Sequence, residues 1–122
     1  VQPYVASVET FGEVSALFID GRFSHGVRKI PVAGDYRVQD DWGATDQPYT
    51  FTAGELAQLE RMLGDVEADL VYARCDMLRG EDGQLLLIEL ELVEPSLFFR
   101  HGPQAASALA EAVIRRAEAR LP

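Results

Sequence analysis

The sequence predicts an α+β domain with a mainly antiparallel sheet and two main helices. Two pairs of strand-like apolar stretches are each joined by an Asp-Gly dipeptide, which is typical of a β-hairpin turn. Two other segments carry apolar side chains at the spacing of a helix. The 122 residues suffice for one domain, residues 1–122, with a modest core.

The first hairpin is expected to join Glu13–Ile19 to Arg22–Lys29 across Asp20 and Gly21. We expect a further strand over Val1–Val8. The stretch Pro31–Pro48 is rich in Gly, Asp and Pro and predicts a long loop. Long loops in compact domains are usually functional or disordered.

Thr52 is expected to begin the first helix, because Glu55 completes a capping box three residues later. Gly64 should end that helix. Its expected buried stripe consists of Leu56, Leu59 and Leu63. Pro103 suits the first turn of a final helix, Gln104–Leu121. The expected buried stripe of this helix consists of Ala106, Leu109, Val113 and Ala117.

The second hairpin carries the strongest functional signal. A two-residue turn at Asp82-Gly83 places Asp76 opposite Glu89 and Arg74 opposite Glu91, all on one face. Two carboxylates about 5 Å apart repel by roughly 3 kcal/mol at an effective dielectric constant of about 20. A divalent cation relieves this repulsion, and three oxygen ligands suit Mg²⁺.

The alternative is a hairpin whose charged face is simply solvated and binds no metal. If the hairpin does bind a metal, the double substitution Asp76→Asn with Glu89→Gln should stabilise the metal-free fold, because it removes the repulsion between the carboxylates. The same change should abolish any Mg²⁺-induced rise in melting temperature.

Composition narrows the function further. Hydrophobic residues make up 48% and charged residues 25%, as in ordinary globular proteins. The net charge of −9 argues against a nucleic-acid partner, which requires a basic surface, and fits a protein that concentrates cations. The single cysteine, Cys75, excludes an intramolecular disulfide and falls on the apolar face of its strand, where we expect a buried thiol.

The sequence has no signal peptide and no apolar run long enough to span a membrane, which predicts a cytoplasmic protein without a membrane partner. It opens on Val1 without an initiator Met, inside an expected strand. We therefore expect a chain that was processed or that is part of something longer.

Other polar residues are weaker candidates. His25 and His101 lie too far apart in sequence to suggest a ligand pair, and we expect structural or surface roles. Ser15 and Ser24 have no adjacent base, so a hydrolase triad is not supported. The cationic set is more useful, because phosphoryl transfer needs positive charge beside a carboxylate-bound metal. This set comprises Arg28, Lys29 and Arg37.

Six short stretches together carry a family resemblance. They are Gln2-Pro-Tyr-Val5, Gly12-Glu-Val-Ser15, Lys29-Ile-Pro31, Gly34-Asp-Tyr-Arg37, Tyr72-Ala-Arg-Cys-Asp76 and Glu89-Leu-Glu-Leu-Val-Glu-Pro95. In this order they resemble the C-terminal portion of an ATP-grasp ligase, near the glutathione synthetase and ribosomal-protein glutamate-ligase branch. Details around Gly34 and Glu94-Pro-Ser-Leu97 are also similar to ligases that close or couple amino-acid derivatives, including the cycloserine-forming enzymes.

The resemblance implies ATP and Mg²⁺ as cofactors and a ligase joining a carboxylate to an amine through an acyl phosphate. It assigns adenine binding to the segment containing Gln2, Tyr4 and Val5, and the ribose hydroxyls to Glu13. It assigns the transferring phosphate to Lys29 and Arg37. The implied Mg²⁺ ligands are Asp76, Glu89 and Glu91.

Two departures from the family pattern matter. An Asp20-Gly21 turn pairs Arg28 with Glu13, unless a bulge restores Lys29 to that position. Nothing in the sequence matches the glycine-rich loop and the lysines of the family's other nucleotide-binding subdomain. The resemblance therefore implies a fragment that is inactive alone, whose partner is the missing N-terminal part and whose exposed sheet could self-associate.

Two rival functions remain. One is a non-catalytic acidic domain that binds a cation or a protein partner. The other is a two-metal nuclease, which is disfavoured by the acidic surface and by the absence of a Lys after Glu89-Leu-Glu91.

Overall fold

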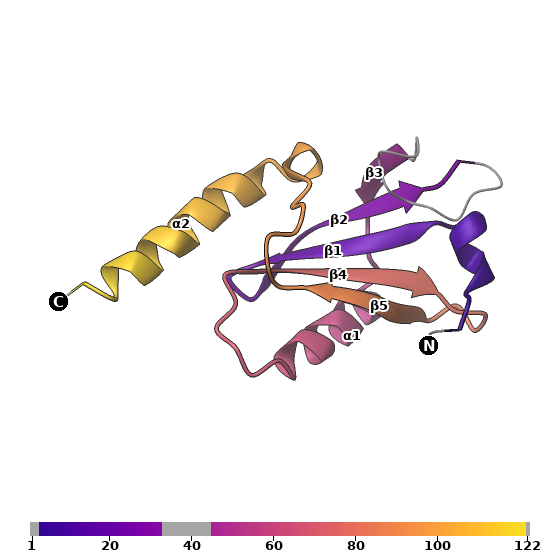
Figure 1. Cartoon of the computed structure of the whole chain (residues 1–122), viewed down its shortest axis with the longest axis horizontal. Helices are drawn as coiled ribbons and strands as arrows, with labels where there is room; N and C mark the ends of the chain where they lie inside the picture. Colours follow the sequence, from indigo (N-terminus) through magenta and orange to yellow (C-terminus); the bar gives the residue numbers. More distant parts are fainter. Residues whose placement is uncertain (1–2, 33–44, 122) are drawn as a thin grey trace.

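The computed structural model describes residues 3–32 and 45–121. Over these residues the chain forms a five-stranded antiparallel sheet with strand order β3-β2-β1-β4-β5 (Figure 1). The strands are β1 (Glu13–Ile19), β2 (Arg22–Ile30), β3 (Thr45–Tyr49), β4 (Tyr72–Arg79) and β5 (Leu85–Glu91). The helices are α1 (Ala53–Gly64) and α2 (Gln104–Glu118), with short 3₁₀ turns η1 (Ala6–Glu9) and η3 (Phe99–His101). The predicted α+β class is confirmed.

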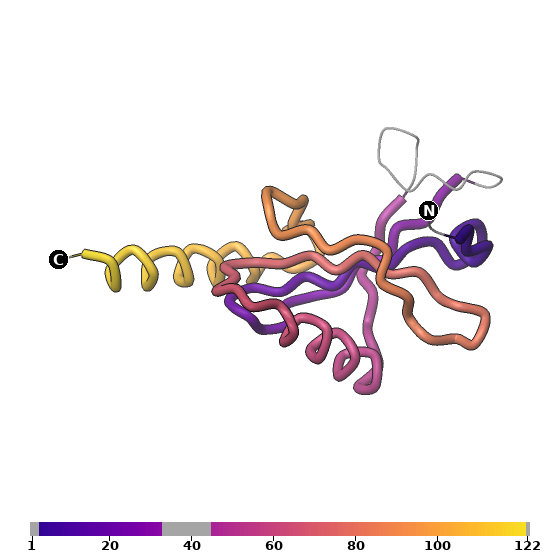
Figure 2. The backbone as a smooth tube through the Cα atoms, turned by 60° about the horizontal axis from the view of Figure 1, so that its bottom comes forward, coloured from indigo at the N-terminus to yellow at the C-terminus, as the bar shows by residue number. Residues whose placement is uncertain are grey.

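Strand β1 lies at the centre of the sheet, and all seven of its residues are buried. One face of the sheet packs against α1 through a cluster that includes Phe18, Leu59 and Met77. The opposite face is covered by the segment after β5, where Phe98 packs on Leu17 and Val27. Figure 2 shows α1 and this segment on opposite sides of the strands. The central strand is therefore covered on both faces, and polar side chains on it are taken out of water.

Helix α1 begins as the sequence predicts. The Thr52 hydroxyl accepts a hydrogen bond from the Glu55 amide at 3.3 Å, and the Glu55 carboxylate accepts one from the Thr52 amide at 2.8 Å. Leu59 is fully buried, while Leu56 and Leu63 are partly buried at the edge of the same core. Arg79 of β4 also donates to Glu55, which fastens the start of the helix to the sheet.

The β1–β2 hairpin contains an irregularity between Leu17 and Phe18, where Ser24 is the extra residue on β2. This bulge shifts the register by one residue beyond the turn. Lys29, rather than Arg28, consequently lies opposite Glu13. Because side chains alternate between faces, the bulge decides which cation reaches the polar face of the sheet.

The β4–β5 hairpin confirms the expected pairs Asp76–Glu89 and Arg74–Glu91 but not the expected turn. Arg79 pairs with Leu85, so residues 80–84 form a longer connection, closed by a 2.8 Å bond from the Gly80 amide to the Gln84 carbonyl. A bulge between Asp76 and Met77 then restores the predicted register. The longer connection shifts the pairing by one residue, and the bulge shifts it back. Asp76 and Arg74 therefore meet the predicted partners Glu89 and Glu91.

Two other predictions are wrong. Residues 6–9 form η1 rather than part of a strand, because the Ser7 carbonyl accepts a 2.7 Å bond from the Phe11 amide and the Ser7 hydroxyl donates to the Arg79 carbonyl at 2.6 Å. These bonds fold the segment onto the end of β4. The expected loop Pro31–Pro48 is also interrupted, because Thr45–Tyr49 pairs with β2 as an edge strand. The middle of that stretch lies outside the described residues.

The predicted buried stripe of the last helix is wrong as well. Ala105 and Ala112 are buried, whereas Val113 and Ile114 are 50% and 55% exposed. The helix extends away from the sheet instead of lying along it (Figure 1). Arg116 holds it through ion pairs with Asp20 at 2.5 Å and Asp69 at 2.6 Å. Among the described residues, no helix has the length and apolar character needed to cross a membrane.

Cys75 lies in the α1-side core and is 1% exposed, as predicted. Burial raises the pKa of its thiol from an ordinary 9.0 to about 11, and the nearby Asp76 charge acts in the same direction. The folded state therefore keeps a proton that the unfolded chain releases above pH 9.

This difference predicts a loss of stability in alkali. As pH rises from about 9 to about 11, the thiol ionises in the unfolded chain but not in the folded one. This difference should lower the free energy of unfolding by roughly 2–3 kcal/mol. Urea unfolding of Cys75→Ala, compared with the unmodified protein at each pH, should show a shallower decline over that interval. If the free energy of unfolding falls equally steeply with pH in both proteins, the decline does not come from the Cys75 thiol. A constant difference in stability between the two proteins would not affect this conclusion.

Candidate active site

One face of the sheet gathers polar side chains from four neighbouring strands. The strand pairings place Ser15 opposite Asp76, and Asp76 opposite Glu89, in one row across the sheet. Side chains two residues apart on the same strand join this row on the same face. The resulting cluster contains Glu13, Ser15, Lys29, Arg74, Asp76, Glu89 and Glu91.

Asp76 is the centre of the cluster and is 1% exposed. Its carboxylate accepts hydrogen bonds from the Ser15 hydroxyl at 2.6 Å and from the Arg74 Nε and Nη2 atoms at 3.0 and 2.8 Å. The Lys29 ammonium lies 3.6 Å from the same group. A buried carboxylate requires such partners, because removing an ionised group from water is costly.

Arg74 is a site residue that the sequence analysis did not assign. Its guanidinium also contacts Glu91 at 3.0 Å, and its side chain is 9% exposed. Burial acts to lower its pKa, but the bonds with Asp76 and the charge of Glu91 outweigh burial and hold the pKa above its ordinary value. The predicted pairing of Arg74 with Glu91 was the signal that could have placed it here.

Lys29 forms an ion pair with Glu13, which is 6% exposed. Burial raises the pKa of the Glu13 carboxyl, and Lys29 opposes this effect without cancelling it. Arg28, the rival cation, leaves the cluster: its Nε donates to the Phe11 carbonyl at 2.6 Å and its guanidinium lies over the Phe11 ring. Of the two cations, Lys29 therefore belongs to the cluster and Arg28 does not.

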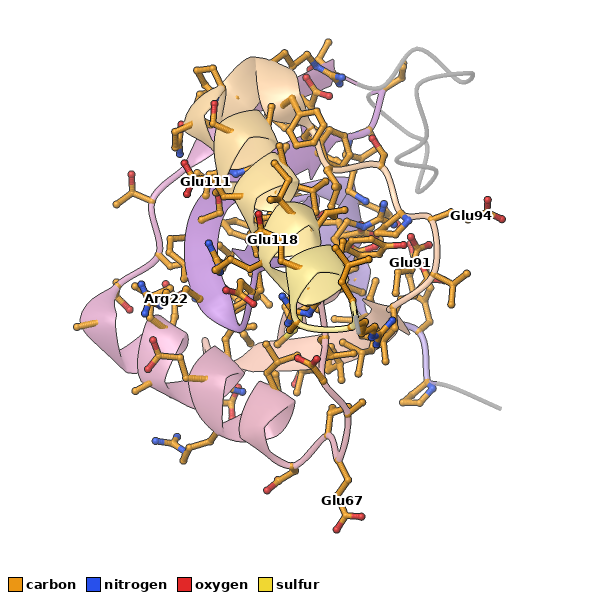
Figure 3. The ribbon with its side chains drawn as sticks, turned by 90° about the vertical axis from the view of Figure 1, so that its left-hand side faces the viewer. Arg22, Glu67, Glu91, Glu94, Glu111 and Glu118 are labelled. Carbon is orange, nitrogen blue, oxygen red and sulfur yellow. The ribbon has the colours of Figure 1, made fainter. Side chains whose placement is uncertain are left out.

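The three predicted metal ligands converge. Each of Asp76, Glu89 and Glu91 offers a carboxylate oxygen, and these oxygens lie within 4.8 Å of one another. Asp76 is buried, Glu91 is half-buried and Glu89 is exposed, so the group opens toward solvent on one side. Figure 3 shows Glu91 nearer to the body of the molecule, while Glu94 points away from it.

Charge balance offers a test of whether a cation fits. Four carboxyl groups of the cluster accompany two cations, Lys29 and Arg74, so the formal charge of the cluster is −2. A hard divalent cation bound by oxygen ligands matches both the donor type and this negative charge. The residues present therefore fit Mg²⁺.

Of the remaining predicted site residues, Tyr4 and Val5 are described, and their contacts are local. Tyr4 is 63% exposed and its hydroxyl donates to Glu9, while the Val5 carbonyl accepts from the Val8 amide at 3.2 Å. Gln2 and Arg37 lie outside the described residues. Their assigned roles stay predictions.

The segment 92–102, called the strap below, covers part of this face. Its Glu94 amide donates to the Tyr72 hydroxyl at 3.2 Å, and Arg74 donates to its Ser96 carbonyl at 3.3 Å. Asp46 of β3 pairs with both Arg100 and His101 at its far end. The expected structural role of His101 is thus observed as an anchor between the strap and an edge strand.

Comparison with solved structures identifies the fold class. The chain matches D-alanine–D-alanine ligase from Bacillus anthracis, in a structure complexed with ATP, with a TM-score of 0.57 and 18% identity over 84% of this chain and 36% of the other. It matches the ATP-grasp ligase PsnB, in a complex with Mg and ADP, with a TM-score of 0.53 and 20% identity over 82% of this chain and 33% of the other. The chain has the fold of part of an ATP-grasp ligase.

Within this class, the chain is homologous to the cycloserine biosynthesis protein DcsG of Streptomyces lavendulae, with 34% identity over 95% of its length. The crystal structure of D-cycloserine synthetase DcsG superposes with a TM-score of 0.77 over 94% of this chain. The chain spans 41% of the length of these relatives. No family model matches it.

The contacts of Asp76 reverse one expectation from the sequence. Asp76→Asn leaves the buried Arg74 without its main counter-charge, so we expect the metal-free fold to lose about 3 kcal/mol rather than to gain stability. Glu89→Gln, at an exposed position, should change stability by less than about 0.5 kcal/mol. Urea unfolding of both variants without Mg²⁺ measures the difference. Equal or higher stability of Asp76→Asn would contradict this account of the cluster.

Proposed function

We propose that this chain supplies the metal- and phosphate-binding half of an ATP-dependent carboxylate–amine ligase. The convergence of the Asp76, Glu89 and Glu91 oxygens within 4.8 Å, beside the cations Lys29 and Arg74, carries the proposal. Homology to DcsG over nearly the whole chain supports it. Because the chain spans only part of its relatives, the complete reaction needs residues outside it.

In the proposed reaction, a substrate carboxylate oxygen attacks the γ-phosphorus of ATP. The bond from that phosphorus to the β–γ bridging oxygen breaks, and ADP leaves. An amine then attacks the acyl carbon, a C–N bond forms, and inorganic phosphate departs while the nitrogen loses a proton. Catalysis of such a transfer is mainly positioning and charge stabilisation.

The residues of the cluster suit these two tasks. Asp76, Glu89 and Glu91 would hold Mg²⁺, which when bound neutralises charge on the phosphates. Lys29 and Arg74 present an ammonium and a guanidinium beside the metal group, and both are little exposed, so their charges are weakly screened. Glu13 and Asp76 fix the positions of these two cations before any ligand arrives.

Three further assignments belong to the proposal. Tyr4 and Val5, with Gln2, would contact adenine, and Arg37 would face the acyl phosphate. Glu13 is assigned to the ribose, although in this structure its carboxylate pairs with Lys29. A cytoplasmic location follows from the need for ATP.

Glu89 and Glu94 offer a matched pair for testing the metal site. Both are exposed glutamates near the end of β5, but only Glu89 belongs to the converging set. In the natural polypeptide that contains these residues, Glu89→Gln should lower the rate of ATP-dependent ADP release by roughly 100-fold. It should also abolish the Mg²⁺-dependent rise in melting temperature measured with ADP. Glu94→Gln should leave both unchanged.

The controls separate the alternatives. A Mg²⁺ response that survives Glu89→Gln would reject the metal site. A Mg²⁺ response without any ADP release, tested against a panel of amino acids and amines, would favour the non-catalytic cation-binding domain.

A further inference from the structure

Two residues of the strap, Glu94 and Phe98, have a positive φ, and Phe98 is the one that packs over the site. Phe98 has φ 46° and ψ 45°, the left-handed region that bulky side chains rarely adopt. The residue is nevertheless only 8% exposed and packs on Leu17 and Val27. Such a backbone conformation persists only where the surrounding contacts enforce it.

The position of this ring matters for the two central cations. The Phe98 ring centroid lies 5.8 Å from the Lys29 ammonium nitrogen and 5.9 Å from the Arg74 guanidinium carbon. An aromatic ring at this distance attracts a cation and keeps water from it. Both effects keep Lys29 and Arg74 in place and strengthen their attraction for a phosphate, because local screening falls.

His25 of β2 contacts the strap on both sides of Phe98. Its Nε2 lies 3.1 Å from the Leu97 carbonyl, which can only accept, so Nε2 carries the proton. Nδ1 then accepts from the Ser24 hydroxyl at 3.0 Å. Gly102 lies against the same ring, and a β-carbon there would be 2.3 Å from Nδ1. The imidazole is 7% exposed.

We propose that His25 is a positioning residue that fixes the Leu97 carbonyl and thereby seats Phe98 over Lys29 and Arg74. The expected consequence is tighter binding of a nucleotide phosphate with Mg²⁺. This consequence rests on the proposed function. Three features converge on this role: a directed hydrogen bond to the residue before Phe98, close packing on Gly102, and a buried ring with both nitrogens engaged. His25 itself touches neither the metal group nor the two cations in any contact described above.

The test uses the natural polypeptide and Mg·ADP as the probe, with two readouts. Isothermal titration gives the dissociation constant. Amide hydrogen exchange at His101 and Gly102, whose N–H groups bond to the Phe98 and Phe99 carbonyls at 2.9 and 3.2 Å, reports the order of the strap. His25→Leu should weaken Mg·ADP binding roughly tenfold and speed exchange at these amides. His25→Gln, which can place an N–H near the same carbonyl, should restore both to within about threefold of the unmodified protein.

Two controls address general destabilisation. Val14→Ala opens a cavity on the α1 side of β1, away from the strap, and should leave Mg·ADP affinity unchanged although the fold is weakened. Phe98→Leu keeps an apolar side chain in place but removes the aromatic face, and should weaken Mg·ADP binding about fivefold even if His25→Leu fails to fold.

The outcomes separate this inference from the proposed function. Unaltered Mg·ADP affinity in His25→Leu or in Phe98→Leu would overturn the positioning role. Unaltered strap exchange in His25→Leu would overturn it too, as would an equal loss of affinity in Val14→Ala. An unmodified protein that does not bind Mg·ADP at all would instead contradict the proposed function.

Discussion

The buried ion pair between Asp76 and Arg74 is the constraint on which the polar face of this domain depends. Asp76 sits on β4 next to the central strand and is almost completely removed from water. Arg74, Ser15 and Lys29 surround it there and supply the polar partners that a buried carboxylate needs. Each partner comes from a strand position that the sheet register determines, so the electrostatics of the site follow directly from the strand pairing.

The alternation of side chains along each strand divides the sheet into two faces. The face toward α1 is apolar and includes Val14, Ala16 and Cys75. The other face alternates with it residue by residue and carries Glu13, Ser15 and Asp76. A central strand with this pattern needs cover on both sides. The α1 side receives a helix, whereas among the described residues the polar side is covered by the strap, and Glu89 stays exposed.

The sequence predicted the parts of the structure that local chemistry decides. The capping box at Thr52, the strand Glu13–Ile19 and the buried Cys75 all follow from short patterns. Asp76 lies opposite Glu89 as predicted, but through a longer connection and a bulge that offset each other. The errors arose where distant contacts prevail. The fold of η1 depends on the Arg79 carbonyl, and the choice of Lys29 over Arg28 depends on the bulge at Ser24. The central role of Arg74 depends on Glu91 of the neighbouring strand and on the Ser96 carbonyl of the strap, which no motif in the sequence marks.

The bulge within β4–β5 has a consequence for how this fold tolerates change in evolution. Because side chains alternate along a strand, slipping a hairpin by one residue turns every side chain to the opposite face. Here Leu85–Leu87 pair with β4 in one register and Glu89–Glu91 pair with it in another. Ile88 is the extra residue between the two registers. The outer end of the hairpin can therefore lengthen or shorten by a residue while a compensating kink keeps the acidic side chains aimed at their partners. The register at the acidic side chains is thus set separately from the register at the tip.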